Sequence, residues 1–205
     1  MEQFIEEMVG LDEANSIELL RESSIELKYS TSIHYECDGH VKDIDVKIID
    51  NVYDEEREIE IEKELGTVKI NMMRHMSWMD YQEAFDFCDR ISQNFLDGFD
   101  ACFKDENSKS KTKFSLEKFS EYVYIDLLKM NENNRGMGIG TAVIREIIDT
   151  LDKTDTLFVV LPFAIEDNEN NKAHKRVKKF WENLGFKKMA NSRFYYFNDK
   201  LMNWY

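Results

Sequence analysis

Three glycines stand at every second position near the middle of the chain, in the hexapeptide Arg135-Gly136-Met137-Gly138-Ile139-Gly140. Glycine lets backbone N–H groups approach a ligand closely because it has no side chain. An amphipathic segment begins directly afterwards at Thr141, and the N-terminus of a helix attracts anions. The pattern therefore predicts an anion-binding loop followed by a helix.

Two common phosphate-binding loops do not fit this hexapeptide. A P-loop ends in Gly-Lys-Ser/Thr, whereas Thr141 follows Gly140 here with no lysine between them. The dinucleotide fingerprint has the spacing G-x-G-x-x-G, and the spacing here is G-x-G-x-G. Neither a P-loop nor a dinucleotide fold is indicated.

The flanking segments place the glycines between a strand and a helix. Residues 122–130 (YVYIDLLKM) form an apolar run that is typical of a strand covered on both faces. After the glycines, apolar residues recur on one helical stripe: Val143, Ile144, Ile147, Ile148 and Leu151. A second apolar strand is predicted at 157–162 (LFVVLP), and a second helix at 172–184 that Gly185 ends.

In this context the chain resembles the GNAT superfamily of N-acetyltransferases. Arg135, Gly138 and Gly140 match its pyrophosphate loop, Arg/Gln-x-x-Gly-x-Gly/Ala, and 181–186 (WENLGF) resembles the aromatic-x-x-x-Gly-Phe ending of its second motif. The resemblance covers about residues 120–198. It implies an α/β fold, a mixed twisted sheet with helices on both faces. We expect a single domain over 1–205, with a divergent N-terminal half at 1–104 and an acyl-CoA-binding core at 114–198.

The resemblance also implies how acetyl-CoA would be held as co-substrate, without a metal. The end of the first strand, Leu128 to Met130, would pair with the pantetheine arm, and an amide near Met130 would polarise the thioester carbonyl. Trp181 would be a core residue or a wall of the cofactor pocket. The pyrophosphate would lie on the backbone amides of Arg135, Gly136, Met137, Gly138, Ile139, Gly140 and Thr141.

Deprotonation of the attacking amine requires a base, and Asp126 is the candidate. It is the one acidic residue inside the apolar run and shares a strand face with Met130. A carboxylate in a covered strand is costly unless it is paired, which marks either a base or a strand-end carboxylate satisfied by a neighbour. Glu121 and Glu166 are the alternatives.

The sequence offers several alternatives for the acid that protonates the leaving thiolate. The family often has a tyrosine four residues before the glycine of Gly-Phe, and that position is Trp181 here. Tryptophan does not supply a proton to a thiolate. Tyr195 or Tyr196 on the last predicted strand would replace it, or water would protonate the thiolate.

The N-terminal half departs from the family pattern. We predict two short helices within 1–30, then an antiparallel meander over 25–73. Its turns are expected at Asp38-Gly39, Asp50-Asn51 and Leu65-Gly66, with a hairpin at 58–73. One long helix is predicted over 81–102, capped by Ser77 or Asp80, and an exposed loop at 104–113. The family usually places its early helices between the first two strands, so the acceptor is not identified.

The overall charge argues against nucleic acid and membrane partners. The 205 residues include 27 Lys and Arg against 41 Asp and Glu, a net charge of −14. Three scattered cysteines and an acidic N-terminus favour a cytoplasmic protein without a disulfide framework. The spacing His34-x-x-Cys37-x-x-His40 lacks a fourth zinc ligand nearby, so no metal site is expected.

Three functions remain open. The first is an N-acetyltransferase that uses acetyl-CoA and a primary amine by direct attack, and the second is a catalytically weak protein that binds or senses acyl-CoA. The third is an interaction protein whose basic helix docks an acidic partner; that helix would otherwise meet the 3′-phosphate of CoA or face solvent. A homodimer is also considered. The basic residues of this helix are Lys172, Lys175, Arg176, Lys178 and Lys179.

Overall fold

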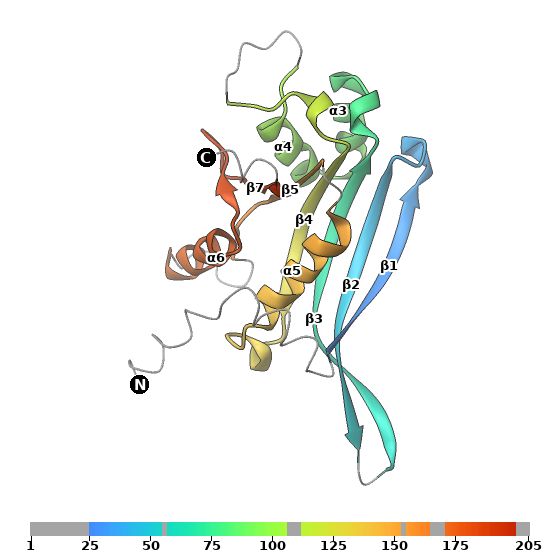
Figure 1. The fold of residues 1–205 in the computed structure, drawn as a ribbon, viewed down its shortest axis with the longest axis vertical. Helices are drawn as coiled ribbons and strands as arrows, with labels where there is room; N and C mark the ends of the chain where they lie inside the picture. The colour runs from blue at the N-terminus through green and yellow to red at the C-terminus, as the bar shows by residue number, and fades with distance from the viewer. Residues whose placement is uncertain (1–24, 55–56, 106–111, 153–154, 165–170, 200–205) are drawn as a thin grey trace.

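The computed structural model describes residues 25–54, 57–105, 112–152, 155–164 and 171–199. Within these ranges one seven-stranded sheet has the order β1-β2-β3-β4-β5-β7-β6 (Figure 1). β4 and β5 run parallel, and the other neighbours run antiparallel. The strands are β1 (Ile25–His34), β2 (Val41–Asp54), β3 (Ile59–Arg74), β4 (Glu121–Met130), β5 (Thr156–Val160), β6 (Lys187–Lys188) and β7 (Tyr195–Phe197). The α-helices are α3 (Tyr81–Ile91), α4 (Gln93–Cys102), α5 (Ile139–Leu151) and α6 (Asn171–Asn183).

Helices cover both faces of the sheet, and β4 lies at its centre. Tyr122 and Tyr124 of β4 pack in one apolar cluster with α3 and α4, whereas Val123 and Ile125 pack in another with α5 and α6. All four side chains are buried, so β4 is covered on both sides. The prediction of an α/β fold with a mixed sheet and helices on both faces is confirmed. None of the helices in the described ranges is long and apolar enough to cross a membrane.

The antiparallel meander of the N-terminal half is confirmed, but two of its three predicted turns are wrong. Asp38 and Gly39 do turn the chain, with φ of 51° and 73°. Asp50-Asn51 lies inside β2, and Leu65-Gly66 lies inside β3 at a register shift. β3 is therefore one uninterrupted strand over Ile59–Arg74, and the hairpin predicted at 58–73 does not exist.

The predicted long helix over 81–102 is two helices. Ser92 has an extended backbone between α3 and α4, and its hydroxyl accepts a hydrogen bond from the Phe95 amide at 3.2 Å. Asp80 caps α3 as predicted, accepting from the Glu83 amide at 2.8 Å. The two helices predicted within 1–30 are not supported where the chain is described, because β1 begins at Ile25. Residues 1–24 lie outside the described ranges.

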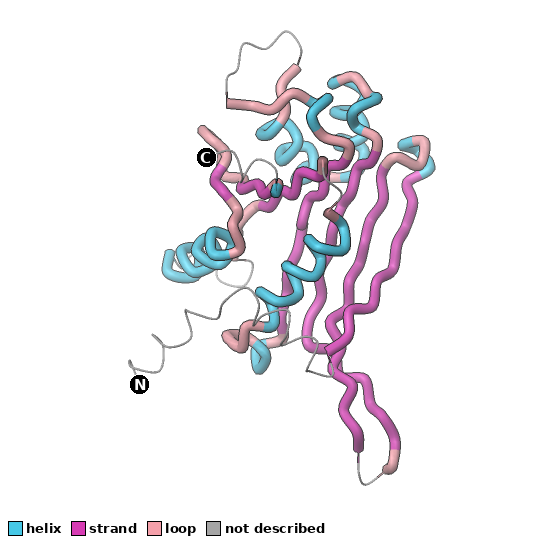
Figure 2. The backbone as a smooth tube through the Cα atoms, in the orientation of Figure 1, coloured by secondary structure: helices cyan, strands magenta, loops and turns pink. Residues whose placement is uncertain are grey.

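β2 and β3 continue beyond the rest of the sheet as a two-stranded projection (Figures 1 and 2). β1 pairs with β2 only as far as Asp50, whereas Asn51–Asp54 still pair with Ile59–Glu62. We call residues 51–54 and 57–62 the arm. Two-stranded ribbons are marginally stable alone in water, so the arm depends on the sheet from which it extends.

Candidate functional site

The two parallel strands at the centre of the sheet separate at their C-terminal ends. β4 and β5 pair only as far as Ile125 and Val160. In the next position β4 contains a bulge: Leu127 lies opposite Lys69 and Ile125 opposite Ile70, which leaves Asp126 outside the register. A bulge bends the strand that contains it. Beyond this point the side of β4 that faced β5 has no strand partner among the described residues.

A groove of about 510 Å³ opens where the strands separate. Its volume is in the usual range for small-molecule sites, and its walls are mainly apolar. The polar and charged residues that line it include Asp126, Asn134, Arg135 and Arg176. Apolar lining residues come from β4, β5 and α6: Ile125, Leu127, Leu128, Met130, Val160, Val177, Phe180 and Trp181.

The glycine loop forms one end of this groove. Gly136 and Gly138 have φ of 76° and 79°, values that L-residues with side chains adopt at a cost. A Cβ atom at either glycine would meet nothing within 4 Å, so the loop backbone is uncovered at both positions. Each of these glycines lines the groove, as does Gly140 at the start of α5.

The loop also presents hydrogen-bond donors. Gly138 is the N-cap of α5, and its carbonyl accepts from the Thr141 and Ala142 amides at 3.0 and 3.1 Å. The N–H groups of residues 136–140 donate to no backbone carbonyl in the described part of the chain. Free amides at the start of a 13-residue helix are suited to an anion such as a phosphate.

A bulge in β3 holds the loop in place. Ile48 and Ile49 of β2 lie opposite Gly66 and Glu64, so Leu65 is the extra residue. The Leu65 carbonyl accepts from the Asn131 amide at 2.9 Å, and the Glu64 carbonyl accepts from the Asn131 side chain at 2.6 Å. The Asn134 side chain also donates to the Leu65 carbonyl, at 3.4 Å. This anchor is not evident from sequence, because Leu65-Gly66 has the composition of a turn and forms a bulge instead.

Gly66 brings β3 unusually close to the end of β4. A Cβ atom there would lie 2.5 Å from the Lys129 carbonyl oxygen and 3.1 Å from the Met130 Cα atom. The Arg135 side chain closes the same corner, because its Nε donates to the Met130 carbonyl at 3.1 Å. Strand end, loop and arginine are thus fixed relative to one another.

Trp181 both lines the groove and belongs to the core. It is 4% exposed and lies in the cluster beneath α5 and α6. The segment after it ends α6 in a Schellman motif: the Phe186 amide donates to the Trp181 carbonyl and the Gly185 amide to the Glu182 carbonyl, both at 3.0 Å. Gly185 has φ of 91°, and the Trp181 and Phe186 rings pack with centroids 5.0 Å apart. The way in which α6 ends therefore explains the residue pattern at 181–186 (WENLGF) without a ligand.

Asp126 lines the same groove as Met130, but its environment differs from the prediction. The carboxylate was expected in a covered strand, and the bulge instead leaves Asp126 exposed. Burial raises the pKa of the neighbouring Tyr124 well above its ordinary value, and the negative charge of Asp126 raises it further. Because water solvates the exposed Asp126 carboxylate, this group does not require a charged partner within the protein.

The remaining acid–base candidates lie elsewhere. Tyr195 is not among the residues that line the groove, and its hydroxyl donates to Glu182 at 3.1 Å. Burial raises the pKa of Tyr195, as does the hydrogen bond to Glu182, so it is a weaker acid than free tyrosine. Glu121 is buried at the far end of β4, 3.7 Å from Arg74. Glu166 lies outside the described residues.

The histidines that suggested a zinc pattern have other contacts. Both ring nitrogens of His34 bond carboxylates, Glu36 at 3.0 Å and Asp43 at 2.8 Å. The His40 ring stacks on Phe87 with centroids 6.0 Å apart. In the described ranges, no group of three His, Cys, Asp or Glu side chains is arranged to hold a metal ion.

Comparisons with known proteins give a remote structural similarity. No family model matches the chain, and no curated protein matches it. Among solved structures, the chain is similar to the crystal structure of AtaTR bound with AcCoA, at 16% sequence identity and a TM-score of 0.41. The similarity covers 78% of this chain and 72% of that chain.

Proposed function

We propose that this chain binds an acyl-CoA, acetyl-CoA in the first instance, and transfers its acyl group to an amine. One observation carries the proposal: the groove between β4 and β5 runs into a glycine loop whose free amides begin α5. A long ligand with an anionic middle and a narrow, amide-bearing arm suits such a site. Arg135, Gly136, Gly138 and Gly140 of the first predicted GNAT motif line this groove, as does Trp181 of the second.

Each part of the groove has a proposed role. The amides of residues 136–140 and the Arg135 guanidinium would hold the pyrophosphate, which places negative charge at the positive end of α5. The unpaired edge of β4 from Leu128 to Met130 would hydrogen-bond the pantetheine amides as a neighbouring strand does. The Met130 amide would then polarise the thioester carbonyl.

The reaction is a direct transfer. The amine nitrogen attacks the thioester carbon, the C–S bond breaks with its electron pair going to sulfur, and the amine loses one proton. Asp126 is the base that we assign, acting through a water molecule because its carboxylate is exposed. No tyrosine, cysteine or histidine is among the described residues that line this groove, so water protonates the thiolate.

Acetyl-CoA should raise the melting temperature of the protein. A ligand that binds only the folded state at about 100 times its Kd stabilises it by about 2.7 kcal/mol. Differential scanning fluorimetry with acetyl-CoA, CoA and ATP measures the effect. We expect a shift with both CoA compounds and a much smaller one with ATP, because ATP lacks the pantetheine arm. An equal shift with ATP would mean that the site binds phosphate groups in general and does not recognise the pantetheine arm of CoA.

Substituting Asp126→Asn should lower kcat by about tenfold while leaving the acetyl-CoA Kd unchanged. General bases typically contribute more than this, and the estimate is small because an exposed carboxylate is poorly positioned. Release of free CoA thiol, followed with an amine panel, gives kcat, and calorimetry gives Kd. A variant with normal kcat would remove Asp126 from the mechanism.

A second candidate, an acyl-CoA-binding or sensing protein, has one observation in its favour. The hydroxyl of Tyr195, the residue expected to supply the acid, points to Glu182. If acetyl-CoA stabilises the protein but no amine releases CoA thiol above the rate of hydrolysis, this candidate replaces the enzyme.

A further inference from the structure

The arm has an exposed apolar face and a concentration of negative charge. Val52 and Ile61 pair across the two strands, and Ile59 follows on the same face; they are 44%, 38% and 49% exposed. The described residues of the arm include four acidic side chains and one basic side chain, and Glu60 and Glu62 lie on the face opposite Ile59 and Ile61. Glu58 and Glu60 form no ion pair with any described residue. Projecting strands with an apolar face are normally covered or protected by charge.

The C-terminal segment has the opposite charge. Residues 171–199 contain eight basic and two acidic side chains, in a chain whose net charge is −14. On α6 the exposed residues include Lys175, Lys178 and Lys179, which pair with no described carboxylate.

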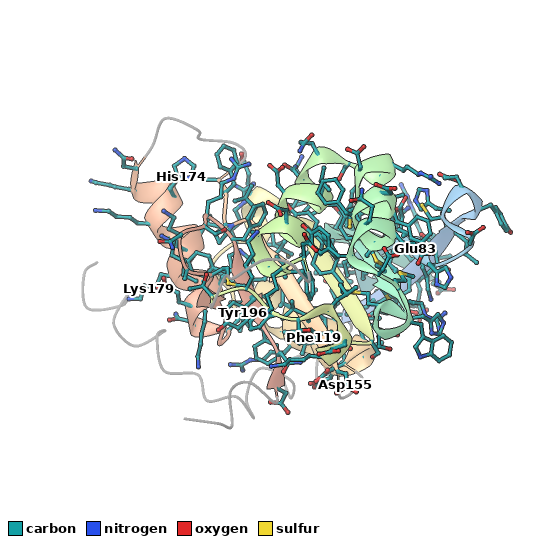
Figure 3. The ribbon with its side chains drawn as sticks, turned by 90° about the horizontal axis from the view of Figure 1, so that it is seen from above. Glu83, Phe119, Asp155, His174, Lys179 and Tyr196 are labelled. Carbon is teal, nitrogen blue, oxygen red and sulfur yellow. The ribbon has the colours of Figure 1, made fainter. Side chains whose placement is uncertain are left out.

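We infer that the arm of one copy of this chain docks on the basic face of α6 in a second copy. The two surfaces lie on different parts of the molecule: the arm extends from the sheet away from α6 (Figure 1). Figure 3 shows His174 and Lys179 on the α6 side of the molecule and Glu83 on the other side. A two-fold arrangement lets both arms engage at once, because each copy offers one arm and one α6.

A second copy fits these surfaces better than an unrelated partner does. One occupant supplies acidic charge to α6 and basic charge to the arm. Complementary charge orients such an interface. The arm also joins the cofactor loop, since the Glu64 and Leu65 carbonyls that follow it hold Asn131. Docking would restrain the strand pair next to that anchor.

Analytical ultracentrifugation of the full chain tests the inference. We expect a dimer that weakens between about 0.05 M and about 0.5 M salt, because salt screens exposed charges. The arm variant Glu58→Lys/Glu60→Lys and the helix variant Lys175→Glu/Lys179→Glu should each weaken dimerisation by about tenfold or more, since each places like charges together. Mixing the two variants should restore a heterodimer, because both of its contacts then join opposite charges.

The matched control is Glu83→Lys/Glu117→Lys, which makes the same charge change on exposed residues away from both surfaces. It should leave dimerisation unchanged, and circular dichroism should show all variants folded. A monomeric wild type at low salt overturns the inference, as does failure of the mixture to associate. If the helix variant instead weakens acetyl-CoA binding and leaves association unchanged, the lysines serve the ligand and the inference is also wrong.

Discussion

Substituting Gly138→Val should lower the affinity for acetyl-CoA by about a hundredfold or more while the protein still folds. Gly138 has φ of 79°, where a β-branched residue costs about 1–3 kcal/mol of backbone strain. Its missing Cβ faces open space and the residue lines the groove, so the added methyl groups would stand beside the amides that are to receive the pyrophosphate. Calorimetry measures the affinity, and urea unfolding measures the stability.

Gly39→Val separates strain from loss of the site. Gly39 has φ of 73° and lies in the β1–β2 turn, where a Cβ atom would meet only Ile33 Cγ2, at 3.8 Å. The Gly39→Val variant should lose about as much stability as Gly138→Val does and keep its affinity for acetyl-CoA. Gly140→Ala should also be tolerated, because its Cβ would make ordinary contacts of 3.8–3.9 Å. Normal affinity for acetyl-CoA in Gly138→Val would contradict the proposal that the loop amides bind the pyrophosphate.

The segments that the sequence predicted well are those whose signal is local. The apolar run at 122–130, the glycine spacing and the helical stripe after it each depend on neighbouring residues, and all appear where expected as β4, the loop and α5. Gly185 likewise ends α6 through contacts within six residues. Local patterns of this kind remain informative before any tertiary structure is known.

The errors come from residues whose conformation depends on a distant partner. Leu65-Gly66 has the composition of a turn, yet β2 pairs on both sides of it, and the turn propensity appears as a bulge. Ser92 is compatible with a helix interior, and only its role as N-cap of α4 reveals the break. Neither outcome can be derived from spacing alone.

The candidate site likewise contains residues that local sequence determines and residues that depend on a distant partner. The glycine loop lies between β4 and α5 as the sequence predicts, whereas the exposure of Asp126 follows from a bulge against Lys69 and Ile70 that no periodicity encodes. Nearness in sequence favours Tyr195 as the acid, whereas its side-chain direction brings its hydroxyl to Glu182. Acid and base assignments depend on such directions, so they are the least predictable part of the site.

Substituting Gly98→Ala in α4 should destabilise the protein by about 1–3 kcal/mol, although alanine favours helices by about 1 kcal/mol over glycine. A Cβ atom at Gly98 would lie 2.6 Å from the Tyr122 hydroxyl and 3.3 Å from the Tyr124 ring. Tyr122 is fully buried, and its ring stacks on Phe95 with centroids 4.9 Å apart, so it cannot swing aside. Urea unfolding measures the free energy, and a stabilised variant would contradict the prediction.

Tyr122→Phe tests whether that contact is the cause. Burial raises the pKa of the Tyr122 hydroxyl well above its ordinary value, so it stays protonated and donates to the Phe95 carbonyl at 3.2 Å. Removing it alone should cost about 1 kcal/mol for the lost hydrogen bond. In Gly98→Ala/Tyr122→Phe the methyl group occupies the space that the hydroxyl leaves, so the double variant should be about 1–2 kcal/mol more stable than additivity predicts. Strict additivity would mean that another contact, such as the Tyr124 ring, limits the site.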